Sequence, residues 1–243
     1  MTVDPGSGLT SVSCSSTRFC AAVDKRGRAA LRVGTRWTGL RLIDKGGGGL
    51  NSVSCAPRTT FCVAVDTNNR ALLYNHGKWS APHKIDNGGG VPDFGLNSVS
   101  CPTAHFCATV NQHDGIEFNG RGWSKPHTVD ALGGFMAAVS CSSSKFCMEV
   151  DFEGDDHTYD NGTWSPPRGP NVGGEFNSVS CRSATFCIGV GLHDALRFKG
   201  GKGPGSWTKP APVDRNGIFS SVSCVSTSYC VAVDQGARVL VLH

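Results

Sequence analysis

Six times along the chain, two cysteines lie six or seven residues apart, after a Ser-Val-Ser or Ala-Val-Ser run and on either side of a short turn. The first cysteines of successive pairs are 41, 46, 40, 40 and 43 residues apart, a period typical of propeller blades and of helical-pair repeats. No cysteine is left over. The pairs are Cys14 and Cys20, Cys55 and Cys62, Cys101 and Cys107, Cys141 and Cys147, Cys181 and Cys187, and Cys224 and Cys230.

Composition separates the two kinds of repeat. The chain has 32 glycines and 12 prolines, and its Val-Ala-Val and Ser-Val-Ser runs lack an apolar i, i+3, i+4 stripe. In the second repeat, residues 51–55, 61–66, 70–75 and 79–86 read as four strands joined by turns, and Pro82 in the last one fits an outer edge. The sequence therefore predicts an all-β, six-bladed β-propeller with four-stranded blades, as a single domain over residues 1–243.

The two ends of the chain complement each other. The sixth repeat stops at "ARVLVLH", after its third strand, whereas "TVDPGSG" at residues 2–8 resembles "TVDALGG" at residues 128–134, which follows the Trp123 strand. We therefore expect the N-terminal residues to complete the last blade as its fourth strand, which would close the ring and remove its open edge.

The cysteine spacing favours one structural disulfide per hairpin. Each pair brackets the turn between the first two strands of a repeat, where side chains face one another across the hairpin. Zinc sites use C-x₂₋₄-C and thioredoxin-like pairs use C-x-x-C, and neither spacing is present. Buried free thiols and a metal site remain as alternatives. Six disulfides predict a secreted or extracellular protein, and the lack of any stretch of about 20 apolar residues argues against membrane insertion.

The stretch "VDTNNRALLYNHGKWSAPHKIDNGGG" and its counterparts "GTRWTGLRLIDKGG", "GRGWSKPHTVDALGG" and "NGTWSPPRGPNVGG" resemble the repeat of bacterial and fungal β-propeller lectins, including the fucose-lectin-like group. The unit "SVSC…FC.AVD" is also similar to cysteine-paired repeats of secreted actinobacterial proteins. The resemblance to lectins implies sugar pockets at or between the blades.

Five tryptophans occupy one repeat position, 16 to 20 residues after the second cysteine. In the lectins this position supplies aromatic surface near the sugar, so the resemblance implies ligand contact; the alternative is a wedge that fills the space between outer strands. The candidate ligand-binding residues are Trp37, Trp79, Trp123, Trp164 and Trp207.

The clearest break in the repeat is "MEVDFEGDDHTYD" in the fourth unit. Its carboxylates are candidate calcium ligands or an acid/base set, but they lack the spacing of an EF-hand loop. The competing interpretation is a solvated acidic turn, which requires no cofactor. The candidates are Asp151, Glu153, Asp155 and Asp156. No catalytic constellation stands out, so the sequence does not predict an enzyme.

These observations predict a recognition module. The first hypothesis is a lectin-like protein that binds a glycan or a cell-surface polysaccharide at repeated sites. The second is a protein-interaction or sensor propeller within a larger secreted protein, and the third is a glycan hydrolase or lyase. The chain has a net charge of +4, but its basic residues are not interleaved with exposed aromatics, so we expect no nucleic-acid partner.

Overall fold

The computed structural model describes residues 8–87, 95–131, 134–168, 175–201, 203–213 and 217–242. Within these ranges the regular structure is entirely β, and there is no helix that could cross a membrane. The chain divides into two compact units, Met1–His127 and Thr128–His243, and each is described by itself.

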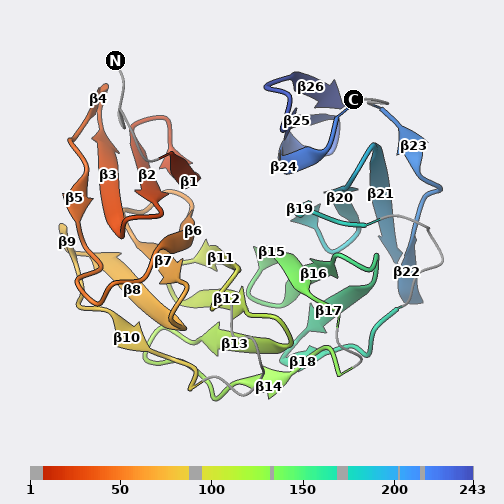
Figure 1. Ribbon diagram of the computed structural model, residues 1–243. Helices are drawn as coiled ribbons and strands as arrows, with labels where there is room; N and C mark the ends of the chain where they lie inside the picture. The colour runs from red at the N-terminus through yellow and green to blue at the C-terminus, as the bar shows by residue number, and fades with distance from the viewer. Residues whose placement is uncertain are drawn as a thin grey trace. The chain divides into compact units, whose positions relative to one another are not determined.

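The first unit contains three antiparallel sheets in chain order, each a meander (Figure 1). Sheet 1 consists of β1 (Leu9–Ser16), β2 (Phe19–Asp24), β3 (Arg28–Val33), β4 (Arg36–Trp37) and β5 (Arg41–Leu42). Sheet 2 consists of β6 (Leu50–Cys55), β7 (Cys62–Asp66), β8 (Arg70–Asn75), β9 (Lys78–Trp79) and β10 (His83–Lys84). Sheet 3 consists of β11 (Ser98–Thr103), β12 (Phe106–Val110), β13 (Asp114–Phe118) and β14 (His127–Thr128), the last at the boundary between the units.

The second unit also contains three such sheets. Sheet 4 consists of β15 (Met136–Ser143), β16 (Phe146–Asp151), β17 (Asp156–Asp160) and β18 (Thr163–Trp164). Sheet 5 consists of β19 (Ser178–Ser183), β20 (Phe186–Val190), β21 (Asp194–Gly201), β22 (Gly203–Trp207) and β23 (Ala211–Pro212). Sheet 6 shows β24 (Phe219–Ser226), β25 (Tyr229–Asp234) and β26 (Val239–Leu242). Its predicted fourth strand, at residues 2–8, lies outside the described residues except for Gly8 and stays a prediction.

The six predicted hairpin disulfides are confirmed. Every pair is bonded, with Cα–Cα distances of 3.9 to 4.1 Å, and no described cysteine is free. In sheet 1, for example, Cys14 of β1 stands directly opposite Cys20 of β2 in the strand register. Each disulfide therefore ties the first two strands of a sheet together beside their turn, as the spacing predicts.

The outer strand differs from the expected continuous segment 79–86. In sheet 2, β9 and β10 pair separately with β8, with a register shift of one residue between them. The Ser80 hydroxyl accepts the Leu73 amide N–H at 3.0 Å, while Pro82 has no N–H to donate. The hydroxyl residue after each tryptophan makes the same bond to the third strand; these residues are Thr38, Ser80, Ser124, Ser165 and Thr208.

Serines of the first strand join neighbouring sheets within each unit. The Cys55 amide donates to Ser13 Oγ at 2.9 Å, and the Cys101 amide donates to Ser54 Oγ at 2.9 Å. Two equivalent bonds link sheets 4, 5 and 6, from Cys181 to Ser140 and from Cys224 to Ser180. The recurring Ser-Cys sequence is thus explained by a hydroxyl that satisfies a backbone amide of the next sheet.

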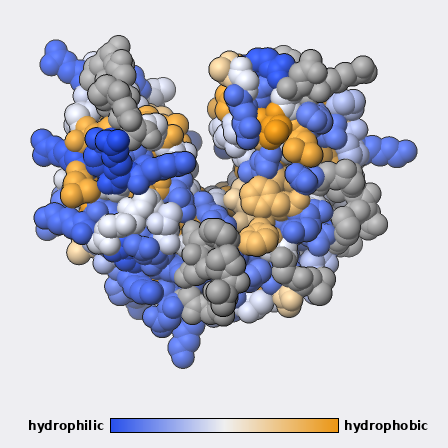
Figure 2. Space-filling model, in the orientation of Figure 1, coloured by the Kyte–Doolittle hydropathy of each residue, from blue (hydrophilic) through white to orange (hydrophobic). Residues whose placement is uncertain are grey.

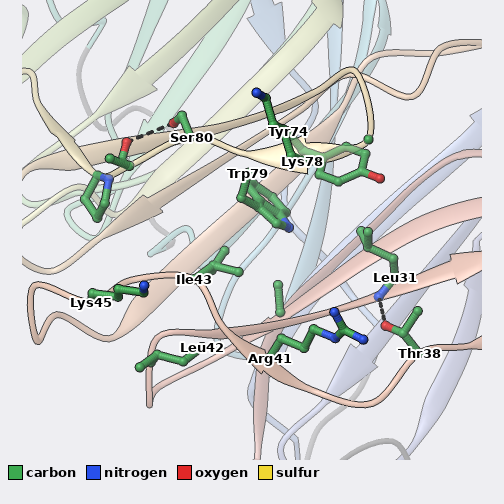
Figure 3. Close-up of a pocket in the computed structure, with 14 residues that line it drawn as sticks. Leu31, Thr38, Arg41, Leu42, Ile43, Lys45, Tyr74, Lys78, Trp79 and Ser80 are labelled. Atoms are coloured by element: carbon green, nitrogen blue, oxygen red, sulfur yellow. Dashed lines mark hydrogen bonds between the residues drawn. The ribbon is translucent and has the colours of Figure 1, made fainter.

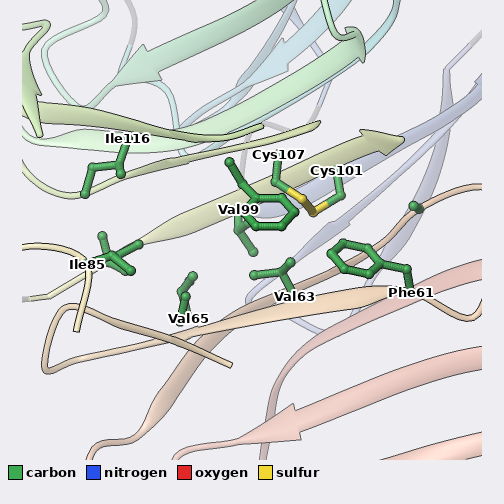
Figure 4. Packing of buried hydrophobic residues seen from close by; sticks show 12 residues of the cluster. Phe61, Val63, Val65, Ile85, Val99, Cys101, Cys107 and Ile116 are labelled. Atoms are coloured by element: carbon green, nitrogen blue, oxygen red, sulfur yellow. A yellow bond between two sulfur atoms is a disulfide. The ribbon is translucent and has the colours of Figure 1, made fainter. Parts of the chain in front are cut away.

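Apolar side chains fill the space between successive sheets. Figure 4 shows the cluster between sheets 2 and 3, in which Val63 and Val65 of β7 face Val99 of β11 and Ile116 of β13. Small and β-branched residues predominate because each strand in the middle of a sheet is covered on both faces. The β7 segment Cys62–Asp66 is accordingly buried along its whole length.

Candidate functional site

The five tryptophans lie at equivalent places in five sheets and are all half-buried. Four of them pack against the aromatic residue opposite them on the third strand. Ring centroids are 5.3 to 5.5 Å apart in the pairs Trp79–Tyr74, Trp123–Phe118, Trp164–Tyr159 and Trp207–Phe198. In sheet 1 the residue opposite Trp37 is Arg32. Each tryptophan therefore lies in its own sheet, and in four of them part of the ring is used for packing within that sheet.

A groove lies between the outer strands of sheets 1 and 2, and we call it the sheet 1–2 groove. It has a volume of about 730 Å³. Figure 3 shows the indole of Trp79 directed from sheet 2 toward Ile43, Leu42 and Arg41 of sheet 1. The groove lies where the outer strand of each sheet is divided into two short pieces that pair separately with the third strand.

Cations line the rim of the sheet 1–2 groove. Arg41, Lys45 and Lys78 are exposed, and the residues that line the groove include no Asp or Glu. The Leu42 side chain beside them is 55% exposed. On the left of Figure 2, where β3 to β5 lie, hydrophobic and hydrophilic surfaces adjoin. The groove thus offers an apolar floor within a positive rim.

The corresponding groove in the second unit, between sheets 4 and 5, has a similar volume of about 690 Å³ but different chemistry. Its cation, Arg168, is bonded to the Asp156 carboxylate at 2.5 Å and lies 5.7 Å from the ring centroid of Phe198. The exposed Asp160 adds a negative charge to this rim. The two grooves also take their tryptophan from different sides. In the sheet 1–2 groove it is Trp79 of the second sheet of the pair, whereas in this groove it is Trp164 of sheet 4, the first sheet of the pair. The two grooves are not copies of one site.

The acidic segment of sheet 4 is not the solvated turn that the sequence favours. Glu149 and Asp151 are fully buried, and Asp156 is only 3% exposed. The sequence resembles a hydrophilic loop here, but Glu149 and Asp151 alternate with the core residues Met148 and Val150 on β16, which places them inside. Only Glu153 of the four candidate ligands is exposed.

Burial changes the ionisation of this segment. It raises the pKa of Asp151 to about 7, with the negative charges of Asp155, Glu153 and Asp130 adding to the effect and the Asp155 amide opposing it. Burial also raises the pKa of Glu149 well above its usual value, and the Asp151 and Asp130 carboxylates raise it further. The pKa of Asp155 is raised by the same causes, although His157 counteracts part of the rise.

The four candidate ligands are divided by their contacts. Asp156 accepts from Arg168 and, at 3.1 Å, from the indole N–H of Trp207, so it fixes Arg168, which lines the groove between sheets 4 and 5. Burial raises its pKa, and Arg168 opposes the rise. The other three candidates lie at the end of β16 and in the turn that leads to β17; they are Asp151, Glu153 and Asp155. As they stand, no three described His, Cys, Asp or Glu side chains already have the arrangement of a metal centre.

Sequence reasoning missed an Asp–Arg pair in the turns between second and third strands, and it missed that sheet 4 lacks this pair. In sheets 1, 2 and 6 the Asp that ends the second strand accepts from the backbone and from the guanidinium of the Arg four residues later, with Nε–Oδ2 distances of 2.6 Å. The pattern D-x-x-x-R, present as "DKRGR", "DTNNR" and "DQGAR", would have revealed it. Sheet 4 carries "DFEGD" instead, so an acid replaces the arginine.

Comparison with known proteins gives the fold and no family. The sequence matches no protein-family model, and no curated protein matches it. Among solved structures, YCF48 with a bound D1 peptide matches with a TM-score of 0.74 and 11% identity, over 100% of this chain and 79% of that chain. YCF48 from Cyanidioschyzon merolae matches with a TM-score of 0.70 and 14% identity, over 98% and 83% of the two chains.

The β-propeller domain of Cps50 (Swd1) from Myceliophteria thermophila matches with a TM-score of 0.69 and 11% identity, over 96% of this chain and 83% of that chain. None of these three neighbours is a lectin by its description. The resemblance to lectin repeats in the sequence therefore gains no support as to function. Together with six successive antiparallel sheets, each with its own hairpin disulfide, the structural matches identify the chain as a six-bladed β-propeller.

Proposed function

We propose that the chain is a recognition module that binds another protein, through a peptide segment that lies in the sheet 1–2 groove. The observation that carries this proposal is the difference between the two grooves. A lectin built from equal repeats presents equal pockets, whereas Arg41, Lys45 and Lys78 make the sheet 1–2 groove positive and Arg168 of the other groove is paired with Asp156. A groove that differs from its counterpart in the second unit suits a single partner better than a set of equal sites does.

The chemistry of the groove defines the segment that fits it. An aromatic or branched apolar side chain would cover Trp79 and Leu42, and acidic residues on either side would meet the cations of the rim. The peptide held by the YCF48 structure shows that a propeller of similar fold accepts a peptide, and this supports the same class of partner here. We infer an extracellular setting from the six disulfides, which persist in oxidising compartments.

The test is selection of peptides from a random displayed library, followed by affinity measurement on the selected sequences. We expect acidic peptides with a central aromatic or apolar residue, and affinity that falls as salt is added. Lys78→Glu and Arg41→Glu should each weaken binding at least tenfold, whereas Lys145→Glu, which changes an exposed lysine of sheet 4, should not. Selection of peptides without acidic residues, or equal binding by Lys78→Glu, would refute the proposal.

Glycan binding is the second candidate, because Trp79 and Trp164 each leave part of an indole facing a groove. A glycan array run beside whole bacterial cell wall tests it directly. Saturable binding of a sugar that is lost in Trp79→Ala and retained in Lys78→Glu would favour the lectin interpretation over the peptide one.

A further inference from the structure

The turn between β7 and β8 of sheet 2 shows how this fold neutralises two buried carboxylates. The Arg70 guanidinium donates to Asp66 at 2.6 Å and to both oxygens of Asp44 at 2.8 and 2.9 Å. Asp44 comes from the end of the preceding repeat, and both aspartates are buried. One cation therefore joins two successive repeats at this position.

Sheet 4 has the same positions with different residues. Asp130 corresponds to Asp44, because each lies eleven residues before the first cysteine of the next hairpin. Asp151 corresponds to Asp66, four residues after the second cysteine of its own hairpin. At the position of Arg70, however, the chain has Asp155.

The neighbouring positions change in the same sense. Glu153 stands where sheet 2 has Asn68, and Gly134 stands where the preceding repeat has Gly48. Compared with the turn of sheet 2, the turn of sheet 4 therefore lacks the arginine and has two additional carboxylates. We call Asp130, Asp151, Glu153 and Asp155 the acidic cluster; all four belong to the second unit.

Three carboxylates of the acidic cluster, those of Asp130, Asp151 and Glu153, lie beside Gly134. A Cβ placed on Gly134 would lie 2.3 Å from Asp151 Oδ2 and 2.8 Å from both Asp130 Oδ2 and Glu153 Oε2. The same construction on Gly48 meets Arg70 Nη2 and Asp66 Oδ2 at 2.9 Å. The place that holds a guanidinium in sheet 2 is thus surrounded by acceptor oxygens in sheet 4.

A buried oxygen of Asp151, and two of the nearby Glu149, lack donors among the described residues. Asp151 has no exposed surface, and its Oδ1 accepts the Asp155 amide at 2.7 Å, but its Oδ2, directed at Gly134, accepts no hydrogen bond from any described residue. Two residues away on the same face of β16, the fully buried Glu149 also has two oxygens without a donor, and His157 Nε2 is 4.0 Å from one of them. Buried carboxylates without compensation are strongly destabilising.

We propose that the acidic cluster binds a calcium ion, which takes the place of the Arg70 guanidinium of sheet 2. Calcium fits because it binds six to eight oxygens at about 2.3 to 2.6 Å in flexible geometry, with water completing the shell. Asp130 and Asp151 are fixed by the fold, whereas the exposed Glu153, beside Gly154 with its φ of 92°, can close over the ion. Because the described side chains do not yet meet at one point, binding draws them together.

The decisive variant is the double substitution Glu153→Asn and Asp155→Arg, which recreates the residues of sheet 2. Chelator-treated protein is titrated with calcium or magnesium, and the melting temperature and heat of binding are recorded. In the parent protein, calcium at about 100 times its Kd should raise the melting temperature by about 5 °C or more, and magnesium should do less. The double variant should show no response to calcium and should already melt higher in chelator.

Asp160→Asn, at the other end of β17, is the matched control and should keep the full response to calcium. If the double variant fails to fold, terbium binding is measured instead, by luminescence excited through tryptophan. The proposal expects a signal in the parent protein that calcium competes away and that Asp151→Asn lacks. No effect of calcium up to about 10 mM, well above the range of extracellular calcium modules, would overturn the proposal. So would a melting temperature in chelator that rises at mild acidity and ignores calcium, because protons would then be neutralising the acidic cluster.

Discussion

At the scale of single residues, the molecule depends on arginines that neutralise buried aspartates. The side chains of Asp24, Asp66 and Asp234 are fully buried, and each is held by an arginine four residues later. The arginines differ in what else they reach. Arg70 is 14% exposed and also bonds Asp44, whereas Arg238 is 43% exposed.

This difference predicts unequal costs of removing the guanidinium. Arg70→Ala should lower the free energy of unfolding by about 3 kcal/mol, since two buried carboxylates lose their partner. Arg238→Ala should cost less, about 1 kcal/mol, because solvent screens the partly exposed Arg238 and the buried Asp234 keeps the backbone amide of residue 238 as a donor. Urea denaturation followed by tryptophan fluorescence compares the two variants. Equal losses would show that the bridge to Asp44 contributes nothing.

The tryptophans give a second prediction at this scale. Trp123 packs on Phe118 and on the apolar cluster between sheets 2 and 3 but remains half-buried. Trp123→Ala should therefore cost about 2 kcal/mol, less than the loss of a fully buried ring, and Trp123→Phe should restore most of it. Thermal melts and ligand stoichiometry are measured on the same protein. Unchanged stability together with one binding site fewer would favour sugar contact instead.

At the scale of strands and sheets, the strand pattern was predictable and the bonds between sheets were not. Alternating small and β-branched residues predict β6, β7 and β8 nearly to the residue, because burial on both faces dictates that composition. The break between β9 and β10 was missed, although the serine after Trp79 and the nearby Pro82 both indicate it. Local propensity does not reveal which hydroxyl will accept a distant amide.

The serine bonds between sheets predict a local effect. Ser54→Ala leaves the Cys101 amide without its acceptor, and this should cost about 1 kcal/mol and speed exchange of that amide with solvent deuterium several-fold. Ser144→Ala, in an exposed turn of sheet 4, is the control. The chain already lacks one such acceptor. Ser52, the other bonding serine of β6, accepts the Val99 amide, but the equivalent residue of sheet 4 is Ala138, which has no hydroxyl to accept the Val179 amide. No change in exchange at Cys101 would show that water replaces the serine.

At the scale of the whole molecule, repeat counting predicted the fold because the cysteine hairpin recurs six times. The chemistry of the two grooves and of the acidic turn was harder to predict from the sequence. Equal repeats predict equal pockets, but the groove rims depend on residues such as Lys78 and Asp160 that differ between repeats. The acidic turn was assigned to solvent because its letters are hydrophilic, whereas the strand register buries Asp151. Both outcomes depend on three-dimensional neighbours that a single repeat does not contain.

Ring closure gives the prediction at this scale. If residues 2–7 form the fourth strand of the last blade, replacing them with a Gly-Ser segment of equal length should lower the melting temperature by several degrees, because β26 loses its pairing partner. Deuterium exchange should then increase at β26 and remain unchanged at β7. A melting temperature equal to that of the parent would show that the last sheet is not completed in this way.

The cysteine–serine hydrogen bonds between sheets all run in one direction, from a cysteine amide to a serine of the preceding sheet, and this affects how repeats can be gained or lost in evolution. Within each unit, the Ser Oγ of a first strand accepts the cysteine amide of the following sheet, as the bonds from Cys55 to Ser13 and from Cys101 to Ser54 show. A whole repeat inserted or lost by recombination would therefore leave each new junction with both a donor and an acceptor. Because the disulfide lies within a repeat, it would travel intact with that repeat. Blade number can thus drift in this architecture without orphaned backbone amides or mispaired thiols, while a single turn such as that of sheet 4 acquires its own chemistry.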